Sequence, residues 1–242
     1  MPEEESVKHT QVVTENTPNY LTRMTLDTLL TKNGVELSPL TKTFCDQGIS
    51  RIRNSADPAH NVGHLERMIF DLDKFVEGNK DLEIDFETLL ISISWHDVWR
   101  AQNFRPNLID ALRSSYTEGP NAAKLVGVEM EKAGFEQNLI DNVKYCVENH
   151  PGPEASKTKR VTTESRILHD LDQMDSWSEE RLKDIKSYLS GNPKGKLVLP
   201  LLRFGRSLIL KAANHDYYFE SSRREKDRRY PRFVKQVEEL FG

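Results

Sequence analysis

The sequence has little cysteine, no long apolar run and no excess of basic residues. Its 242 residues include only two cysteines, Cys45 and Cys146, which argues against a disulfide-rich secreted fold. No apolar segment reaches the roughly 18 residues that a membrane-spanning helix needs. The net charge is −4, so bulk charge does not favour a nucleic-acid partner. We therefore expect a cytoplasmic protein without a membrane or nucleic-acid partner.

Glycine, proline and polar clusters divide the chain into helical segments. Residues 1–18 are polar and are expected to form a flexible arm, followed by a single helical domain over residues 19–242. Apolar residues then recur at helical spacing, and no segment shows the alternation of a strand. The predicted fold is all-α, with roughly ten helices. The expected helices cover residues 20–30, 39–52, 60–76, 85–97, 107–132 with a possible break at Gly119-Pro120, 137–149, 165–177, 179–189, 196–214 and 230–241.

Four segments rich in histidine and aspartate carry the chemistry. They hold five of the seven histidines and no cysteine. Imidazole and carboxylate groups bind divalent cations, and a site without thiolates differs from a closed structural zinc site because it keeps a position for water. The segments are His60-Asn61-Val62-Gly63-His64, Trp95-His96-Asp97, Asn149-His150 and His169-Asp170-Leu171-Asp172.

Each segment taken alone also has a purely structural interpretation. Adjacent residues such as His96 and Asp97 point about 100° apart on a helix, so both reach one ion only where the helix ends. Otherwise they are a core histidine beside a capping aspartate. His60 and His64 are four residues apart and would share a helix face, either as ligands or as a solvated pair. A zinc protease is excluded because Asn61 stands where its catalytic glutamate belongs.

The later segments are equally ambiguous alone. His150 closes a predicted helix, where the helix dipole favours an imidazole without any further role. The aspartates that follow His169 could form a solvated helix face instead of a site. Asp172 is the member of that group that we expect to contribute a ligand.

Order and spacing together resemble the HD-domain superfamily of metal-dependent phosphohydrolases. His64 is followed after 32 residues by His96-Asp97, and Asp172 lies 75 residues beyond Asp97. His64-Leu-Glu-Arg-Met resembles the first-ligand helix of the family, Ser94-Trp95-His96-Asp97 its signature dyad, and the segment 170–175 its Asp-x-Asp-x-x-Asp motif. The resemblance covers roughly residues 55–178 and is similar in detail to a bacterial branch of predicted phosphohydrolases.

The resemblance implies an HD-type helical bundle with one divalent cation held by His64, His96, Asp97 and Asp172, with His60 as the alternative first ligand. Mn, Mg, Co, Ni, Fe and Zn all remain open as the metal. The implied activity is hydrolysis of a phosphorylated small molecule, such as a nucleotide. The oligomeric state does not follow from the sequence.

The chain departs from the family pattern at Arg100. Some family nucleotidases place a water-activating glutamate there, whereas a guanidinium cannot act as a base but can bind phosphate. His60 and Asp97 are therefore the candidate catalytic groups. Arg100, Arg105 and His150 are the candidate substrate-binding residues, and the Lys157–Arg160 loop offers further cations. Two alternatives stay open, namely a dinuclear-iron oxygenase that uses extra histidines and a metal-containing binding or regulatory module.

Overall fold

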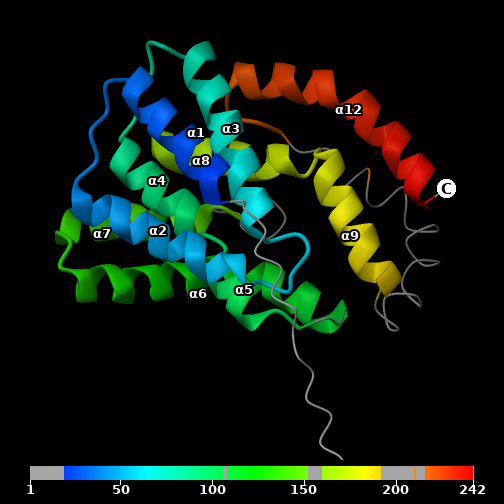
Figure 1. The fold of residues 1–242 in the computed structure, drawn as a ribbon, viewed down its shortest axis with the longest axis horizontal. Coiled ribbons are helices and arrows are strands. Elements are labelled where there is room, and N and C mark those ends of the chain that lie inside the picture. Colours follow the sequence, from blue (N-terminus) through cyan, green and yellow to red (C-terminus); the bar gives the residue numbers. More distant parts are fainter. Residues whose placement is uncertain (1–18, 106–107, 152–159, 192–209, 211–215, 242) are drawn as a thin grey trace, which may run out of the picture.

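The computed structural model describes residues 19–105, 108–151, 160–191, 210 and 216–241, and within these ranges all regular structure is α-helical (Figure 1). This confirms the predicted all-α bundle of roughly ten helices. The expected arm 1–18 and nearly all of the expected helix 196–214 lie outside the described residues. The helices are α1 (Asn19–Lys32), α2 (Pro39–Arg53), α3 (Val62–Gly78), α4 (Phe86–Trp95), α5 (Val98–Asn103), α6 (Leu108–Ala133), α7 (Gln137–Asn149), α8 (Thr163–Asp175), α9 (Glu179–Gly191) and α12 (Glu220–Phe241).

Capping side chains set the starts of α2 and α4. Ser38 precedes Pro39, and its Oγ accepts a hydrogen bond of 3.0 Å from the backbone N–H of Thr41. Asp85 caps α4 in the same way, because its Oδ1 accepts from the N–H groups of Glu87 and Thr88, each at 3.1 Å. Such caps satisfy backbone donors that have no partner within the helix.

Several helix boundaries differ from the prediction, and α5 was not predicted as a separate helix. Three of the differences bear on the site or on prolines. The third helix begins at Val62 instead of His60, because Asn61 is its N-cap and its side chain accepts from the His64 N–H at 3.1 Å. His60 therefore lies before α3 and does not share a helix face with His64. The other two differences are at prolines: α6 continues through Pro120, and α12 begins at Glu220, ten residues earlier than expected. Tertiary packing overrides the local effect of proline at both positions.

Helix α4 lies inside the bundle and ends at the candidate site. It packs against α2, α7 and α8 (Figure 1). Leu89, Leu90, Ile91 and Ile93 are at most 1 % exposed, as expected for a nearly continuous apolar helix. Trp95 at its end stacks on Phe44 of α2 with ring centroids 4.6 Å apart. These contacts hold the C-terminal end of α4, and with it His96 and Asp97, in the interior.

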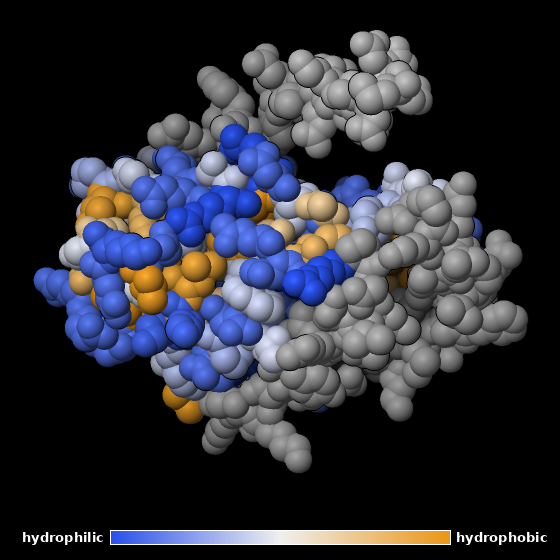
Figure 2. Space-filling view, turned by 90° about the horizontal axis from the view of Figure 1, so that it is seen from below, coloured by the Kyte–Doolittle hydropathy of each residue, from blue (hydrophilic) through white to orange (hydrophobic). Residues whose placement is uncertain are grey.

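A smaller apolar cluster joins α9 and α12 to the end of α8. It consists of Trp177, Leu182, Phe233 and Val237. The surface seen in Figure 2 is mainly hydrophilic, with smaller apolar patches between the charged side chains. Among the described residues, no helix is both long and apolar enough to span a membrane.

Gly119 lets α6 approach α7 closely, and we expect Gly119→Ala to destabilise the protein. The added methyl group would clash with the backbone carbonyl of Glu148 and would lie 3.2 Å from the Pro151 side chain. Overpacking of this kind costs about 1–3 kcal/mol, which corresponds to a Tm lowered by roughly 2–10 °C. Thermal unfolding followed by circular dichroism measures the change. Gly78→Ala is the control, because its methyl group would lie 3.7 Å from Ser221. Equal Tm values for the two variants would contradict the close approach.

Candidate metal centre

The four predicted ligands converge at the C-terminal end of α4. His96 and Asp97 form the turn between α4 and α5, His64 lies in the first turn of α3, and Asp172 is in α8. The sequence argument required the dyad to stand at a helix end, and α4 does end at Trp95. The turn lets two adjacent side chains face one point, which a continuous helix would prevent.

The ligand atoms have the spacing that one ion requires. The Nε2 atoms of His64 and His96 are 3.2 Å apart. Asp97 Oδ2 lies 3.3 Å from the first and 3.2 Å from the second. Asp172 Oδ1 lies 3.5 Å from His64 Nε2. Ligands about 2.0–2.2 Å from a shared ion are separated by roughly 2.9–3.6 Å in octahedral or tetrahedral geometry. The buried His and Asp groups can therefore hold a metal ion.

The carboxylate of Asp97 gives the most direct sign of a cation. Asp97 is 2 % exposed, and its Oδ2 atom has no hydrogen-bond partner. A buried carboxylate oxygen without a hydrogen bond is rare in folded proteins, and here ion pairs with the two imidazoles are what offset its lost hydration. This oxygen is also the one that faces both imidazole Nε2 atoms. A divalent cation between the three atoms would give Asp97 Oδ2 a strong partner. The residues present therefore fit the predicted metal.

Each buried histidine is anchored through Nδ1, which directs Nε2 into the cluster. The Nδ1 atom of His64 bonds to Asp175 Oδ2 at 2.7 Å, that of His96 to the Ile93 carbonyl at 2.8 Å, and that of His150 to the Val147 carbonyl at 2.6 Å. Because these partners are oxygen acceptors, each Nδ1 donates and leaves a lone pair on Nε2. Histidine ligands of metals are commonly oriented in this way.

The cluster attracts positive charge strongly. Burial lowers the pKa of His96, but the charge of Asp97 outweighs it and raises that pKa to about 9. Burial also opposes ionisation of Asp97, yet His96 and His60 hold its pKa well below the ordinary value. At neutral pH, the protein without metal therefore carries protons on imidazoles that a cation would displace. Metal binding should release protons for this reason.

Asp175 supports the cluster from behind. It is fully buried and accepts from His64, Arg67 and Arg181, the last at 3.2 Å. Burial raises its pKa, but these charges together hold the pKa far below the ordinary value.

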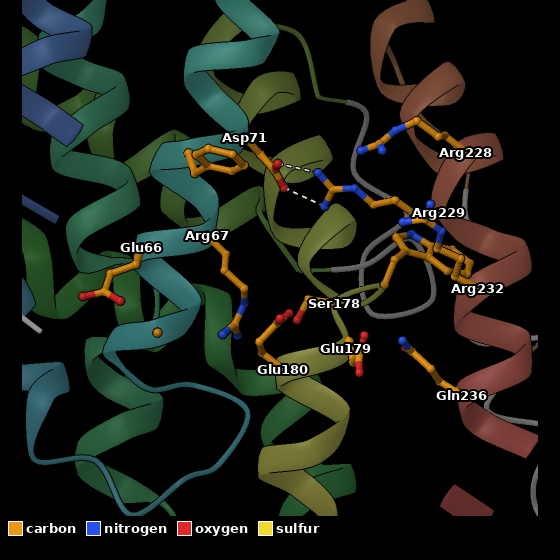
Figure 3. A pocket seen from close by; sticks show the side chains of 13 residues that line it. Glu66, Arg67, Asp71, Ser178, Glu179, Glu180, Arg228, Arg229, Arg232 and Gln236 are labelled. Atoms are coloured by element: carbon orange, nitrogen blue, oxygen red, sulfur yellow. Dashed lines mark hydrogen bonds and ion pairs between the residues drawn. The ribbon is translucent and has the colours of Figure 1, made fainter. Parts of the chain in front are cut away.

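Arg67 also lines a cavity of about 500 Å³ between α3, the start of α9 and α12 (Figure 3). In this cavity Arg229 pairs with Asp71 at 2.9 Å, so part of its positive lining is already neutralised.

The remaining predicted site residues lie outside the group of four ligands. His150 is 2 % exposed, and its Nε2 lies 3.9 Å from Asp97 Oδ1, so it adjoins the metal cluster. His60 Nδ1 and Arg100 Nε both bond to Asp57 Oδ2, at 2.8 and 3.1 Å. Arg105 is exposed.

Arg160 was expected among the cations that the Lys157–Arg160 loop offers, but its guanidinium is bound to the backbone instead. It is 3 % exposed and donates to the carbonyl oxygens of Asn149, His150 and Pro151, which lie at the end of α7. A guanidinium so placed completes the helix end, because these carbonyls have no partner within the helix. Lys157 lies outside the described residues.

The sequence analysis missed Glu118, which lies on α6. Its carboxylate, a carboxylate oxygen of Asp97 and a ring nitrogen of His60 are all within 4.8 Å of one another. Glu118 is 8 % exposed, and its Oε1 has no hydrogen-bond partner. Burial and the charge of Asp97 raise the pKa of Glu118 to about 7, although His60 acts against this shift. In the described part of the chain there are three such ligand groups, and two of them contain Asp97.

We expect Asp175→Asn to weaken metal binding without removing a ligand. The amide cannot supply the negative charge that orients His64 and pairs with Arg67 and Arg181. Loss of such an outer partner lowers metal affinity by about 10–100-fold. Titration with Mn²⁺ measures the affinity, and Asp81→Asn, at an exposed loop position, is the control. Equal affinity in all three proteins would show that Asp175 does not support the site.

Comparisons with protein-family models, with curated proteins and with solved structures found no match for this chain. The sequence motifs and the geometry of the cluster are therefore the basis for the function.

Proposed function

We propose that this protein is a metal-dependent phosphohydrolase of the HD type that acts on a phosphorylated small molecule, such as a nucleotide. The observation that carries the proposal is the unpartnered Oδ2 of Asp97, which lies 3.2–3.3 Å from two imidazole Nε2 atoms at a buried helix end. The order and spacing of the four ligand residues support the same assignment. They resemble the HD pattern, and other chemistry at a His/Asp cluster would not require that order.

Four side chains are proposed to hold the ion: His64, His96, Asp97 and Asp172. When bound, a divalent cation would lower the pKa of a water molecule and polarise a P–O bond. The histidines stay neutral and directed by their Nδ1 partners, while the two aspartates supply negative charge. Four protein ligands leave room for water and for a phosphate oxygen if the ion is six-coordinate.

Arg100 is the proposed phosphate-binding residue. Its Nε donates to Asp57, and its two Nη nitrogens make no hydrogen bond with the described residues. The side chain is mostly buried, and its charge acts on Glu118, so the guanidinium lies beside the cluster. Two N–H donors fixed in a plane match two phosphate oxygens, and they would stabilise charge that builds up in the transition state.

His60 is the proposed proton-transfer group. Asp57 accepts from its Nδ1, so its Nε2 is the atom available to the Asp97–Glu118 group. The charges of Asp97 and Asp57 raise the pKa of His60, although burial lowers it. With no ion at its Nε2, His60 could then donate a proton to a leaving group more readily than it could accept one. Asp97 is the other predicted catalytic residue, and we assign it the role of a metal ligand.

Phosphate release from a panel of phosphate esters tests the proposal. The full chain is stripped with a chelator and reloaded separately with Mn²⁺, Mg²⁺, Co²⁺ or Ni²⁺. We expect release that depends on metal and is absent in Asp97→Ala. Metal retention without turnover on any nucleotide, sugar phosphate or pyrophosphate would contradict a phosphohydrolase and favour the binding-module alternative. The oxygenase alternative needs extra histidines near a second ion. His150 adjoins the cluster, with its Nε2 3.9 Å from Asp97 Oδ1, whereas His169 is in none of the ligand groups among the described residues.

Replacement of Arg100 should weaken substrate binding. Charge-assisted hydrogen bonds contribute about 1.5–3 kcal/mol, so Arg100→Ala should raise KM by roughly 10–100-fold. Arg100→Lys should recover part of this loss, because it restores charge without the two-pronged geometry. Metal affinity should be unchanged or slightly higher. Steady-state kinetics on the best ester measure the effect, with exposed Arg105→Ala for comparison. A loss at Arg105 and none at Arg100 would move the role to Arg105.

A further inference from the structure

We propose a second divalent-cation site beside the first, formed by His60, Asp97 and Glu118, with Asp97 shared between the two ions. The three side chains offer one imidazole nitrogen and two carboxylate oxygens, all within 4.8 Å of one another. They come from three different parts of the chain: the segment before α3, the turn after α4, and α6. Only the fold brings them together.

Glu118 is the first argument for a cation at this place. It is more than nine-tenths buried, its Oε1 has no hydrogen-bond partner, and its carboxylate faces the other two groups. A buried carboxylate needs a counter-charge or donors to offset its lost hydration. The close approach of α6 to α7 at Gly119 places the neighbouring Glu118 in the interior, where it is 8 % exposed.

The orientation of His60 is the second argument. Its Nδ1 is bound to Asp57 at 2.8 Å, and Asp57 itself is anchored by the Ala59 N–H at 2.9 Å. His60 thus shows the arrangement of His64, His96 and His150, in which an oxygen acceptor holds Nδ1 and Nε2 is left for the site. Asp57 would be the outer partner of a ligand histidine.

The charge of the centre allows a second cation when the substrate is an anion. Its carboxylates are Asp57, Asp97, Glu118, Asp172 and Asp175. Three guanidinium groups oppose these five, those of Arg67, Arg100 and Arg181. With neutral imidazoles, two negative charges remain, which one divalent ion neutralises. A second ion makes the centre positive by two charges, matching a phosphate monoester dianion. That last point rests on the proposed function, whereas the second cation does not.

The ligand set indicates which metal would bind. One imidazole with two carboxylates is a harder donor set than the two imidazoles and two carboxylates of the first site, and it favours ions of the Mn²⁺ class. Asp97 has two oxygens and can bridge, and ions that share a carboxylate lie about 3.5–4 Å apart in two-metal sites.

Mn²⁺ binding to the full chain tests the second site directly. Metal-free protein is titrated, and electron paramagnetic resonance of free Mn²⁺ counts the bound equivalents. We expect two equivalents and a spin-coupled pair in the wild type, and one uncoupled equivalent in Glu118→Gln. Glu131→Gln, an exposed change on the same helix, should keep two. His60→Gln should match Glu118→Gln and serves as the second variant if the first does not fold, as judged by circular dichroism.

One equivalent in the wild type, or two in both Glu118→Gln and His60→Gln, would overturn the second site. The proposed function is tested separately by phosphate release. Two coupled equivalents without hydrolysis would leave the second site standing and contradict the function. One equivalent with metal-dependent hydrolysis would contradict the second site and support the function.

Discussion

Purified Asp97→Ala protein is expected to retain no divalent ion. Asp97 is common to the two ligand groups that contain His60 or His150, and its Oδ2 lies 3.2–3.3 Å from both His64 and His96 Nε2. The substitution removes a charged ligand and leaves the imidazoles without the carboxylate that attracts positive charge to them. Metal analysis after desalting measures retention, and a Mn²⁺ titration gives the affinity.

The loss should be specific to the metal centre. Asp141→Ala removes an exposed aspartate of α7 and should retain metal like the wild type. Circular dichroism separates loss of the ion from loss of the fold. If Asp97→Ala binds Mn²⁺ as tightly as the wild type, the assignment of the site is wrong.

The second large effect distinguishes His64 from His60. His64→Ala should lose the ion, because His64 Nε2 faces His96, Asp97 and Asp172 at 3.2–3.5 Å. His60→Ala should keep the ion at the His64 site and lose turnover, since His60 lies before α3 and is bound to Asp57. The reverse outcome, with metal lost only in His60→Ala, would make His60 the ligand and His64 an outer residue.

Much of the fold was predictable from local signals. The caps at Ser38 and Asp85 and the apolar spacing located α2 and α4 closely. The possible break at Gly119-Pro120 and the late start expected for the last helix were wrong, because packing decides both. Pro120 stays within α6, which packs along α7, and Pro231 stays within α12, where Phe233 and Val237 pack on Trp177. Such long-range contacts cannot be read from neighbouring residues.

In the candidate site, too, local sequence signals identified some residues, and long-range contacts decided the others. His64, His96, Asp97 and Asp172 were identified because each stands in a segment of recognisable type, and the structure brings these four together. Glu118 had no such signal, since it is a single glutamate beside Gly119-Pro120. Its place depends on the close approach of α6 to α7. Arg160 likewise looked like a loop cation, and only the fold shows that it is buried against the end of α7.

The central claim is that one divalent ion binds between His64, His96, Asp97 and Asp172. The most direct test is a crystal of the full chain grown with Mn²⁺, with diffraction data collected on both sides of the manganese absorption edge. The account predicts an anomalous peak about 2.0–2.3 Å from His64 Nε2, His96 Nε2 and a carboxylate oxygen of each aspartate. The absence of a peak between these four side chains at saturating Mn²⁺ would contradict it, whether or not a second peak lies between His60 and Glu118.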